Sequence, residues 1–212
     1  MLEKLPDAVG HALSGVRAGL DQTLYHAVDL RQGMAAITVA SLAFADHAPM
    51  PQKYSADGAG LSPPLHWSGV PAAATAVALI VEDADSPTPA PLVHAIVVDL
   101  PAGDGALAEG VMSELGEVPP VVPMGRNSYL QAAWLPPDPL PGHGAHRYVF
   151  QIFALAPGPA FEGMPGRDAL RAVLVERGLA SGCLIGTYER PDATIAESVS
   201  ATEVGLPRLA AG

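Results

Sequence analysis

Three groups of titratable side chains stand next to short apolar runs of the sequence. Apolar runs that are rich in β-branched and aromatic residues, and bounded by Pro or Gly, are typical of buried strands. The groups are Asp83 and Asp85 after the run 77–81, His94 at the start of the run 94–100, and His146 before the run 147–155. Loops at strand ends are the usual place for binding groups. The pattern therefore indicates a small pocket of carboxylates and imidazoles at one rim of a sheet.

The chemistry that suits these residues is the binding of an anion. A protonated imidazole donates charge-assisted hydrogen bonds to phosphate or carboxylate, and a nearby carboxylate orients the ring and raises its pKa. We expect His94 and His146 to be the donors, with Asp83 orienting His94 or donating directly when protonated. His143 stands between glycines and is expected in a solvated loop. Taken singly, each group also fits a structural role, because Asp-x-Asp before Ser-Pro is a common turn composition.

Other chemistries have weaker signals. The His143-x-x-His146 pair with Asp83 and Asp85 could bind a divalent metal, but it lacks the Glu of the zinc protease signature. A Gly-x-Ser-x-Gly elbow, a P-loop and a dinucleotide fingerprint are absent from the sequence. The single cysteine, Cys183, excludes an intrachain disulfide and a multi-cysteine metal site, and is a weak nucleophile. We expect no metal, no cofactor and no catalysis, with a hydrolase as the least favoured alternative.

Composition excludes several classes of protein. The 212 residues carry 11 Lys and Arg against 22 Asp and Glu, so a nucleic-acid-binding surface is not expected. Hydrophobic residues make up 49%, which excludes a disordered chain. The 22 Gly and 22 Pro argue against a helical bundle. The sequence shows neither a long apolar span nor a basic start followed by an apolar run, so we expect a cytoplasmic protein without a membrane span.

The elements that would position these groups are mostly strands. Further short strands are expected at 37–39, 42–44 and 184–188, and a helix over 167–180 with Gly178 as its stop. Because no regular βαβ alternation links the runs, a parallel α/β sheet is disfavoured. Apolar residues at steps of three and four also predict a helix over 5–24, which either packs on the main domain or forms a homodimer contact. Its apolar positions are Leu5, Val9, Ala12, Leu13, Val16, Leu20 and Leu24.

Five segments together resemble the phosphatidylethanolamine-binding protein family, which includes the Raf kinase inhibitor-like proteins. Residues 81–87 (VEDADSP) with 93–97 (VHAIV) resemble its first signature, and residues 141–150 (PGHGAHRYVF) resemble its second. The remaining segments fit the bacterial YbhB/YbcL-like branch and are 62–67 (SPPLHW), 125–129 (GRNSY) and 184–188 (LIGTY). The resemblance covers roughly residues 35–190, in order and with suitable spacing.

The resemblance implies a mainly β fold: a large central antiparallel sheet, a smaller sheet packed against it and a few peripheral helices. The chain would divide into an N-terminal helical extension (1–33), the family domain (34–192) and a C-terminal tail (193–212). The implied pocket lies at one end of the central sheet and is lined by Asp83, Asp85, His94 and His146, with Tyr148 nearby. Ser86-Pro87 is the candidate for a cis peptide bond.

The implied function is the non-catalytic binding of a small anion such as phosphate or phosphoethanolamine, with a phospholipid headgroup as one form of such a ligand. The alternative is a kinase or protease inhibitor that acts through surface loops. Upstream of the second signature, Trp134 and Leu135 stand where the family often has small residues. These two side chains are expected to narrow or reshape the rim of the pocket.

Overall fold

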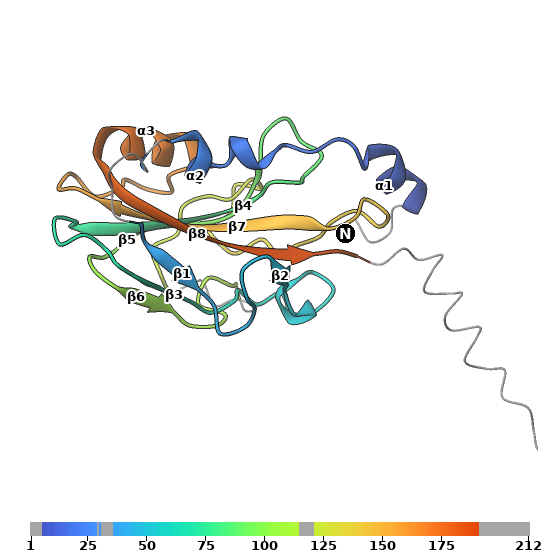
Figure 1. The fold of residues 1–212 in the computed structure, drawn as a ribbon, viewed down its shortest axis with the longest axis horizontal. Helices are drawn as coiled ribbons and strands as arrows, with labels where there is room; N and C mark the ends of the chain where they lie inside the picture. Colours follow the sequence, from blue (N-terminus) through green and yellow to red (C-terminus); the bar gives the residue numbers. More distant parts are fainter. Residues whose placement is uncertain (1–5, 29, 31–35, 115–120, 191–212) are drawn as a thin grey trace, which may run out of the picture.

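Two packed β-sheets form the body of the protein (Figure 1). The computed structural model describes residues 6–28, 30, 36–114 and 121–190. The large sheet has the strand order β2-β8-β7-β4-β5, in which β2 runs parallel to β8 and the other pairs are antiparallel. Its strands are β2 (Ala48–Pro49), β8 (Gly178–Tyr188), β7 (His146–Leu155), β4 (Ala76–Asp83) and β5 (Leu92–Pro101).

The small sheet has the antiparallel order β1-β3-β6 and lies against one face of the large sheet. Its strands are β1 (Thr38–Ala40), β3 (Leu65–Ser68) and β6 (Gly105–Leu107). The helices are α1 (Asp7–Leu13), α2 (Leu24–Ala27), α3 (Arg167–Arg177) and the 3-10 turns Leu20–Gln22 and Gln52–Tyr54. The mainly β fold with two sheets and few helices is the one that the sequence predicted.

The central strands are apolar along almost their whole length because both faces of the large sheet are covered. On β4, Val77, Leu79 and Val81 face the cluster that includes the small sheet, whereas Ala78 and Ile80 face the helices. Alternate residues of a strand point to opposite faces, so this division follows from the pleat. Leu170 and Leu174 of α3 complete the second cluster, and both are fully buried. The predicted runs 77–81, 94–100, 147–155 and 184–188 lie in β4, β5, β7 and β8.

One local strand prediction is wrong in this part of the fold, and one helix prediction is confirmed with shorter bounds. Residues 42–44 form no strand, because the Ser41 hydroxyl donates to Pro64 O at 2.6 Å and accepts from Ala43 N at 3.1 Å, which turns the chain. The helix predicted over 167–180 is present as Arg167–Arg177 and ends at Gly178 as expected, and Gly178 then begins β8 with extended backbone (φ −67°, ψ 131°).

The single helix predicted over 5–24 is also wrong. Helix α1 ends at Leu13, and the helical turns at Leu20–Gln22 and Leu24–Ala27 are separate. Between them, Ala18 N donates to Ser86 O at 3.0 Å and Gly19 N donates to Ala84 O at 2.8 Å. These bonds to the loop after β4 replace the bonds that a continuous helix would make. Leu5 lies outside the described residues.

The remaining predictions concern a cis peptide bond, the two ends of the family domain and a membrane span. All peptide bonds of the described residues are trans, so the cis bond expected at Ser86-Pro87 is not present. The C-terminal tail expected over 193–212 lies outside the described residues, as do residues 31–35 around the expected domain boundary. The described residues contain no helix that is long and apolar enough to cross a membrane.

Candidate functional site

The antiparallel pairing of the central strands brings three predicted site residues to one end of the large sheet. Asp83, the last residue of β4, pairs with Tyr148 of β7, two positions after His146. His94 lies at a register shift of β5, where Val81 pairs with Ala95 but Glu82 pairs with Val93. Such a bulge re-aims a side chain relative to regular pairing. Asp83, His94 and His146 all line one cavity of about 490 Å³.

The walls of this cavity come from elements outside the sheet. One wall is the segment from Leu135 to Leu140, which precedes the second signature, and another is α1, through Val9 and Leu13. Trp134 and Leu135 were both expected to shape the rim of the pocket, but only Leu135 does so. Leu135 lines the cavity, whereas the Trp134 side chain is 4% exposed and packs in the core near Phe150.

Asp83 pairs with His146 and not with His94 as expected. The Nδ1 atom of His146 lies 2.7 Å from Asp83 Oδ2, and its Nε2 atom lies 2.7 Å from His143 Nδ1. His143 is 1% exposed instead of solvated, and its Nε2–H donates to Leu13 O at 2.9 Å. Both ring nitrogens of His146 are therefore occupied within the protein, so the expectation that His146 donates to the ligand is not met in this arrangement.

The protonation of this chain of groups follows from counting its hydrogens. Three hydrogen bonds join Leu13 O, His143, His146 and Asp83, and each bond contains one proton. Two neutral imidazoles supply two of these protons, so the third makes one ring an imidazolium or sits on the Asp83 carboxyl. Burial, together with nearby His146 and Arg17, lowers the pKa of His143, so this ring is neutral, donates from Nε2 to Leu13 O and accepts at Nδ1 from His146.

His94 is held differently and keeps one ring nitrogen available. Its Nδ1 lies 2.6 Å from Leu135 O, and because a carbonyl only accepts, the Nδ1 atom carries the proton. The Nε2 atom is buried and has no hydrogen-bond partner among the described residues. Burial lowers the pKa of His94, so the ring is neutral near pH 7 and its Nε2 presents a lone pair. An unpartnered buried nitrogen is costly unless something binds it.

Tyr148 supplies a second unpartnered polar atom beside His94. Its ring meets the His94 ring edge-on with centroids 5.1 Å apart, and its hydroxyl is buried with no partner among the described residues. Burial raises the pKa of Tyr148 well above its usual value, and the neighbouring carboxylate of Asp83 raises it further. The phenol therefore stays protonated and is a donor, which agrees with the predicted position of Tyr148 near the pocket.

Asp85 does not line the cavity, contrary to the prediction. Its carboxylate is 1% exposed and accepts two bonds at 2.7 Å from the Arg147 guanidinium, while Arg17 Nη1 lies 3.1 Å away. Burial by itself raises the pKa of Asp85, but hydrogen bonds from Arg147 and Arg17 outweigh it and lower the pKa to about 2. Asp85 is thus a permanently charged structural group that fastens the N-terminal segment to β7.

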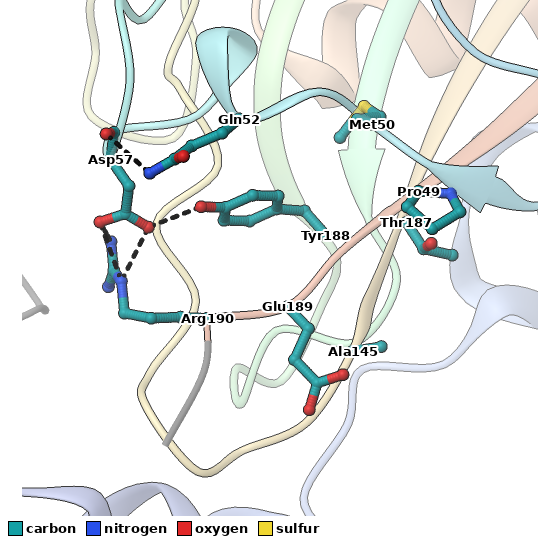
Figure 2. A pocket seen from close by; sticks show the side chains of 9 residues that line it. All are labelled: Pro49, Met50, Gln52, Asp57, Ala145, Thr187, Tyr188, Glu189 and Arg190. Atoms are coloured by element: carbon teal, nitrogen blue, oxygen red, sulfur yellow. Dashed lines mark hydrogen bonds and ion pairs between the residues drawn. The ribbon is translucent and has the colours of Figure 1, made fainter. Parts of the chain in front are cut away.

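A second hollow of about 720 Å³ lies beside β2 and the end of β8 (Figure 2). Three of its polar side chains bond one another: Tyr188 donates to Asp57 Oδ2 at 2.7 Å and Arg190 Nη2 donates to Asp57 Oδ1 at 2.6 Å. Arg190 Nη2 also lies 2.7 Å from Asp138, whose side chain lines the first cavity. One guanidinium thus serves two carboxylates.

Sequence reasoning missed His143, Arg17 and Asp138. For His143 the available signal is the His-x-x-His spacing, which by itself indicates only a weak metal-binding pair. Among the described residues, no group of three or more His, Cys, Asp or Glu side chains has an arrangement that could hold a metal ion. Arg17 and Asp138 carry no local signal, because their partners are far away in the sequence.

The structure thus has a two-sheet β fold with a cavity at the strand ends, and His94, whose Nε2 atom has no partner among the described residues, belongs to the lining. The sequence profile of the phosphatidylethanolamine-binding protein family matches residues 40–189. The chain belongs to this family, and the predicted resemblance is confirmed.

Individual relatives agree with this assignment. A UPF0098 protein of Mycobacterium tuberculosis is 39% identical over 153 residues, which span 72% of this chain and 70% of the relative. A UPF0098 protein of Methanothermobacter thermautotrophicus is 32% identical over 148 residues, or 70% of this chain and 95% of the relative. The crystal structure of Escherichia coli YbcL, described as a member of the mammalian PEBP family, matches with a TM-score of 0.66 and 25% identity. That match covers 74% of this chain and 99% of YbcL.

Proposed function

We propose that the cavity at the end of β4 and β7 binds a small acid, a phosphate or carboxylate compound, and that it does so together with a proton. The observation that carries this proposal is the buried Nε2 atom of His94, which faces the cavity without a partner among the described residues. Tyr148 adds a protonated hydroxyl close to it. A bound acid would satisfy both atoms.

The proton is needed because the neutral His94 ring offers a lone pair to the cavity. A fully ionised anion would be repelled by this lone pair and by the nearby Asp138 carboxylate. Either the ligand brings its own proton, as a phosphate monoester monoanion does, or His94 takes one up and becomes a charge-assisted donor. Because the net charge of the chain is −11, the overall field of the protein does not help to attract the anion.

We propose further that the site is non-catalytic. Ser86 Oγ and Thr88 Oγ1, the aliphatic hydroxyls of the cavity lining, lie 2.7 Å apart and hydrogen-bond each other rather than a histidine. Nucleophilic catalysis requires a hydroxyl or thiol next to a base, so this arrangement favours binding without turnover. A cytoplasmic location and the absence of a cofactor remain part of this proposal.

The test is titration calorimetry with sulfate, which carries no proton near neutral pH, so that its binding requires His94 to take up a proton from the solvent and donate a hydrogen bond. A bound anion raises the pKa of His94, whereas burial lowers it in the free protein. The affinity should therefore be highest at about pH 5.5 and fall by up to about tenfold per pH unit toward about pH 8.5. Phosphoethanolamine keeps a proton on its phosphate below its second pKa of about 6. Its affinity should therefore begin to fall at a higher pH than the affinity for sulfate does.

A matched variant is His94→Asn, whose amide keeps a donor for Leu135 O but removes Nε2. It should weaken sulfate and phosphoethanolamine binding by at least about tenfold and abolish the pH dependence of sulfate binding. Equal sulfate affinity across the pH range, or unchanged affinity in His94→Asn, would contradict the proposal.

A further inference from the structure

We propose that the N-terminal segment 6–19 is a wall of the ligand cavity that selects acids carrying an apolar body, such as monoalkyl phosphates, over the bare anion. The segment lies outside the family match at 40–189. The inference rests on the proposed function, because it assumes that an acid group is bound near His94.

The first observation is the position of α1. Figure 1 shows α1 at the end of the large sheet where β8 ends and β7 begins. Val9 and Leu13, four positions apart and so on one face of the helix, both line the cavity. The apolar face of α1 therefore borders the cavity and is not packed against core side chains at these two positions. Leu135 and Leu140 add further apolar surface to the same lining.

The second observation is that the segment is fastened to loops on both sides of the cavity. Toward the loop before β7, Arg17 donates to Ala145 O at 2.9 Å and to His143 O at 3.0 Å. Toward the loop after β4, Ala18 N and Gly19 N donate to Ser86 O and Ala84 O. These backbone and guanidinium bonds make the segment a built part of the cavity.

The third observation is the close contact of α1 with the chain beneath it. A Cβ atom placed on Gly10 would lie 1.9 Å from Pro141 O, so only glycine permits this approach. His143 also donates to Leu13 O, the last residue of the helix. These contacts fix the position of α1 against His143 and the residues beside it. The positions of Val9 and Leu13 relative to His94 are therefore set by the fold.

The chemical consequence is a division of the site by polarity. Acid recognition belongs to His94 and Tyr148, whereas Val9 and Leu13 can bury only an apolar group. A volume of about 490 Å³ is far more than an inorganic phosphate needs and is in the usual range for small organic ligands. Burial of alkyl groups against Leu13 would add affinity that the bare anion cannot gain.

The experiment measures the affinities of inorganic phosphate and butyl phosphate by calorimetry, in the wild type, Leu13→Ala and Val16→Ala. Val16 is the matched control, because it belongs to the same segment but is 48% exposed and does not line the cavity. The wild type and Val16→Ala should bind butyl phosphate more tightly than phosphate. In Leu13→Ala this preference should fall by roughly three- to tenfold, while phosphate affinity stays within about twofold.

Gly10→Ala is a second variant that does not depend on the size of one side chain. It should displace α1 and reduce the same preference while phosphate binding remains. If Leu13→Ala and Gly10→Ala both keep the wild-type preference, or if the wild type shows no preference at all, the wall inference is overturned. If the wild type binds neither phosphate nor butyl phosphate, the proposed function itself fails, and the two failures are thus distinguishable.

The source of the alkyl phosphate is decided by a further arm. Cosedimentation with phosphatidylcholine vesicles that contain phosphatidic acid presents the same phosphate monoester on a membrane. Binding of butyl phosphate without binding to the vesicles supports a soluble ligand, and binding of both supports a lipid source for the same chemistry. Binding to the vesicles that is unchanged in Leu13→Ala would contradict the inference.

Discussion

The Nε2 atom of His146 lies 2.7 Å from the Nδ1 atom of His143, so the histidine of the second signature is bound to another histidine. Its other ring nitrogen bonds Asp83, so His146 is the middle of a chain of hydrogen bonds that runs from Asp83 through His143 to the backbone of α1. This arrangement leaves the Nε2 atom of His94 and the Tyr148 hydroxyl as the unpartnered polar atoms of the described site. These two atoms are therefore expected to bind the ligand, whereas their neighbours have a structural role.

Tyr148→Phe should weaken ligand binding without weakening the fold. The variant removes a buried hydroxyl that has no partner among the described residues, so its loss costs no protein hydrogen bond. We expect the free energy of unfolding to stay the same or rise by about 1 kcal/mol, and sulfate affinity to fall about fivefold or more. Denaturant unfolding and calorimetry measure the two effects. A variant that is clearly less stable than the wild type would show that the hydroxyl has a structural partner.

His143→Ala should loosen α1. The change removes the donor to Leu13 O and the acceptor for the Nε2–H of His146, which leaves two buried polar groups unsatisfied. The free energy of unfolding should fall by about 1–3 kcal/mol, and amide hydrogens of residues 7–13 should exchange faster. Denaturant unfolding and hydrogen exchange followed by mass spectrometry measure these changes.

The control for His143→Ala is His66→Ala, because His66 is an exposed side chain of β3 in the small sheet. It should change the unfolding free energy by less than about 0.5 kcal/mol and leave exchange in residues 7–13 unaltered. Equal effects of the two variants would show that the histidine chain does not hold α1.

Asp85 should give the protein part of its resistance to acid. Its pKa is lowered in the folded state to about 2, so its contribution to stability is complete above the ordinary value of 3.8 and is lost as the pH falls toward 2. This contribution is roughly 2 kcal/mol. Asp85→Asn should lower the unfolding free energy at neutral pH by about 2–4 kcal/mol, since it removes one partner of Arg147 and Arg17.

Denaturant unfolding between pH 7 and pH 2 checks this prediction, with the exposed Asp21→Asn as the matched control. In Asp85→Asn the loss of stability below about pH 4 should be smaller than in the wild type by roughly 2 kcal/mol. If the unfolding free energy falls as steeply below about pH 4 in Asp85→Asn as in Asp21→Asn, the acid sensitivity belongs to other carboxylates.

Much of the fold could be predicted from the sequence because its signals are local. The apolar runs that became β4, β5, β7 and β8 are bounded by turn residues, and β-branched and aromatic side chains suit a pleated, buried surface. Asp83, His94 and His146 could be placed at or near strand ends for the same reason. Their gathering at one cavity follows from antiparallel pairing of neighbouring strands.

The partners of these residues could be learned only from the tertiary structure. Asp83 and Asp85 are two positions apart in one motif, yet one pairs with His146 in the site and the other with Arg147 and Arg17 away from it. The helix predicted over 5–24 is interrupted because Ala18 and Gly19 bond to residues 84–86. A hydrogen bond depends on atomic positions within a few tenths of an ångström. The packing of the whole chain sets those positions, and the spacing of residues along the sequence does not.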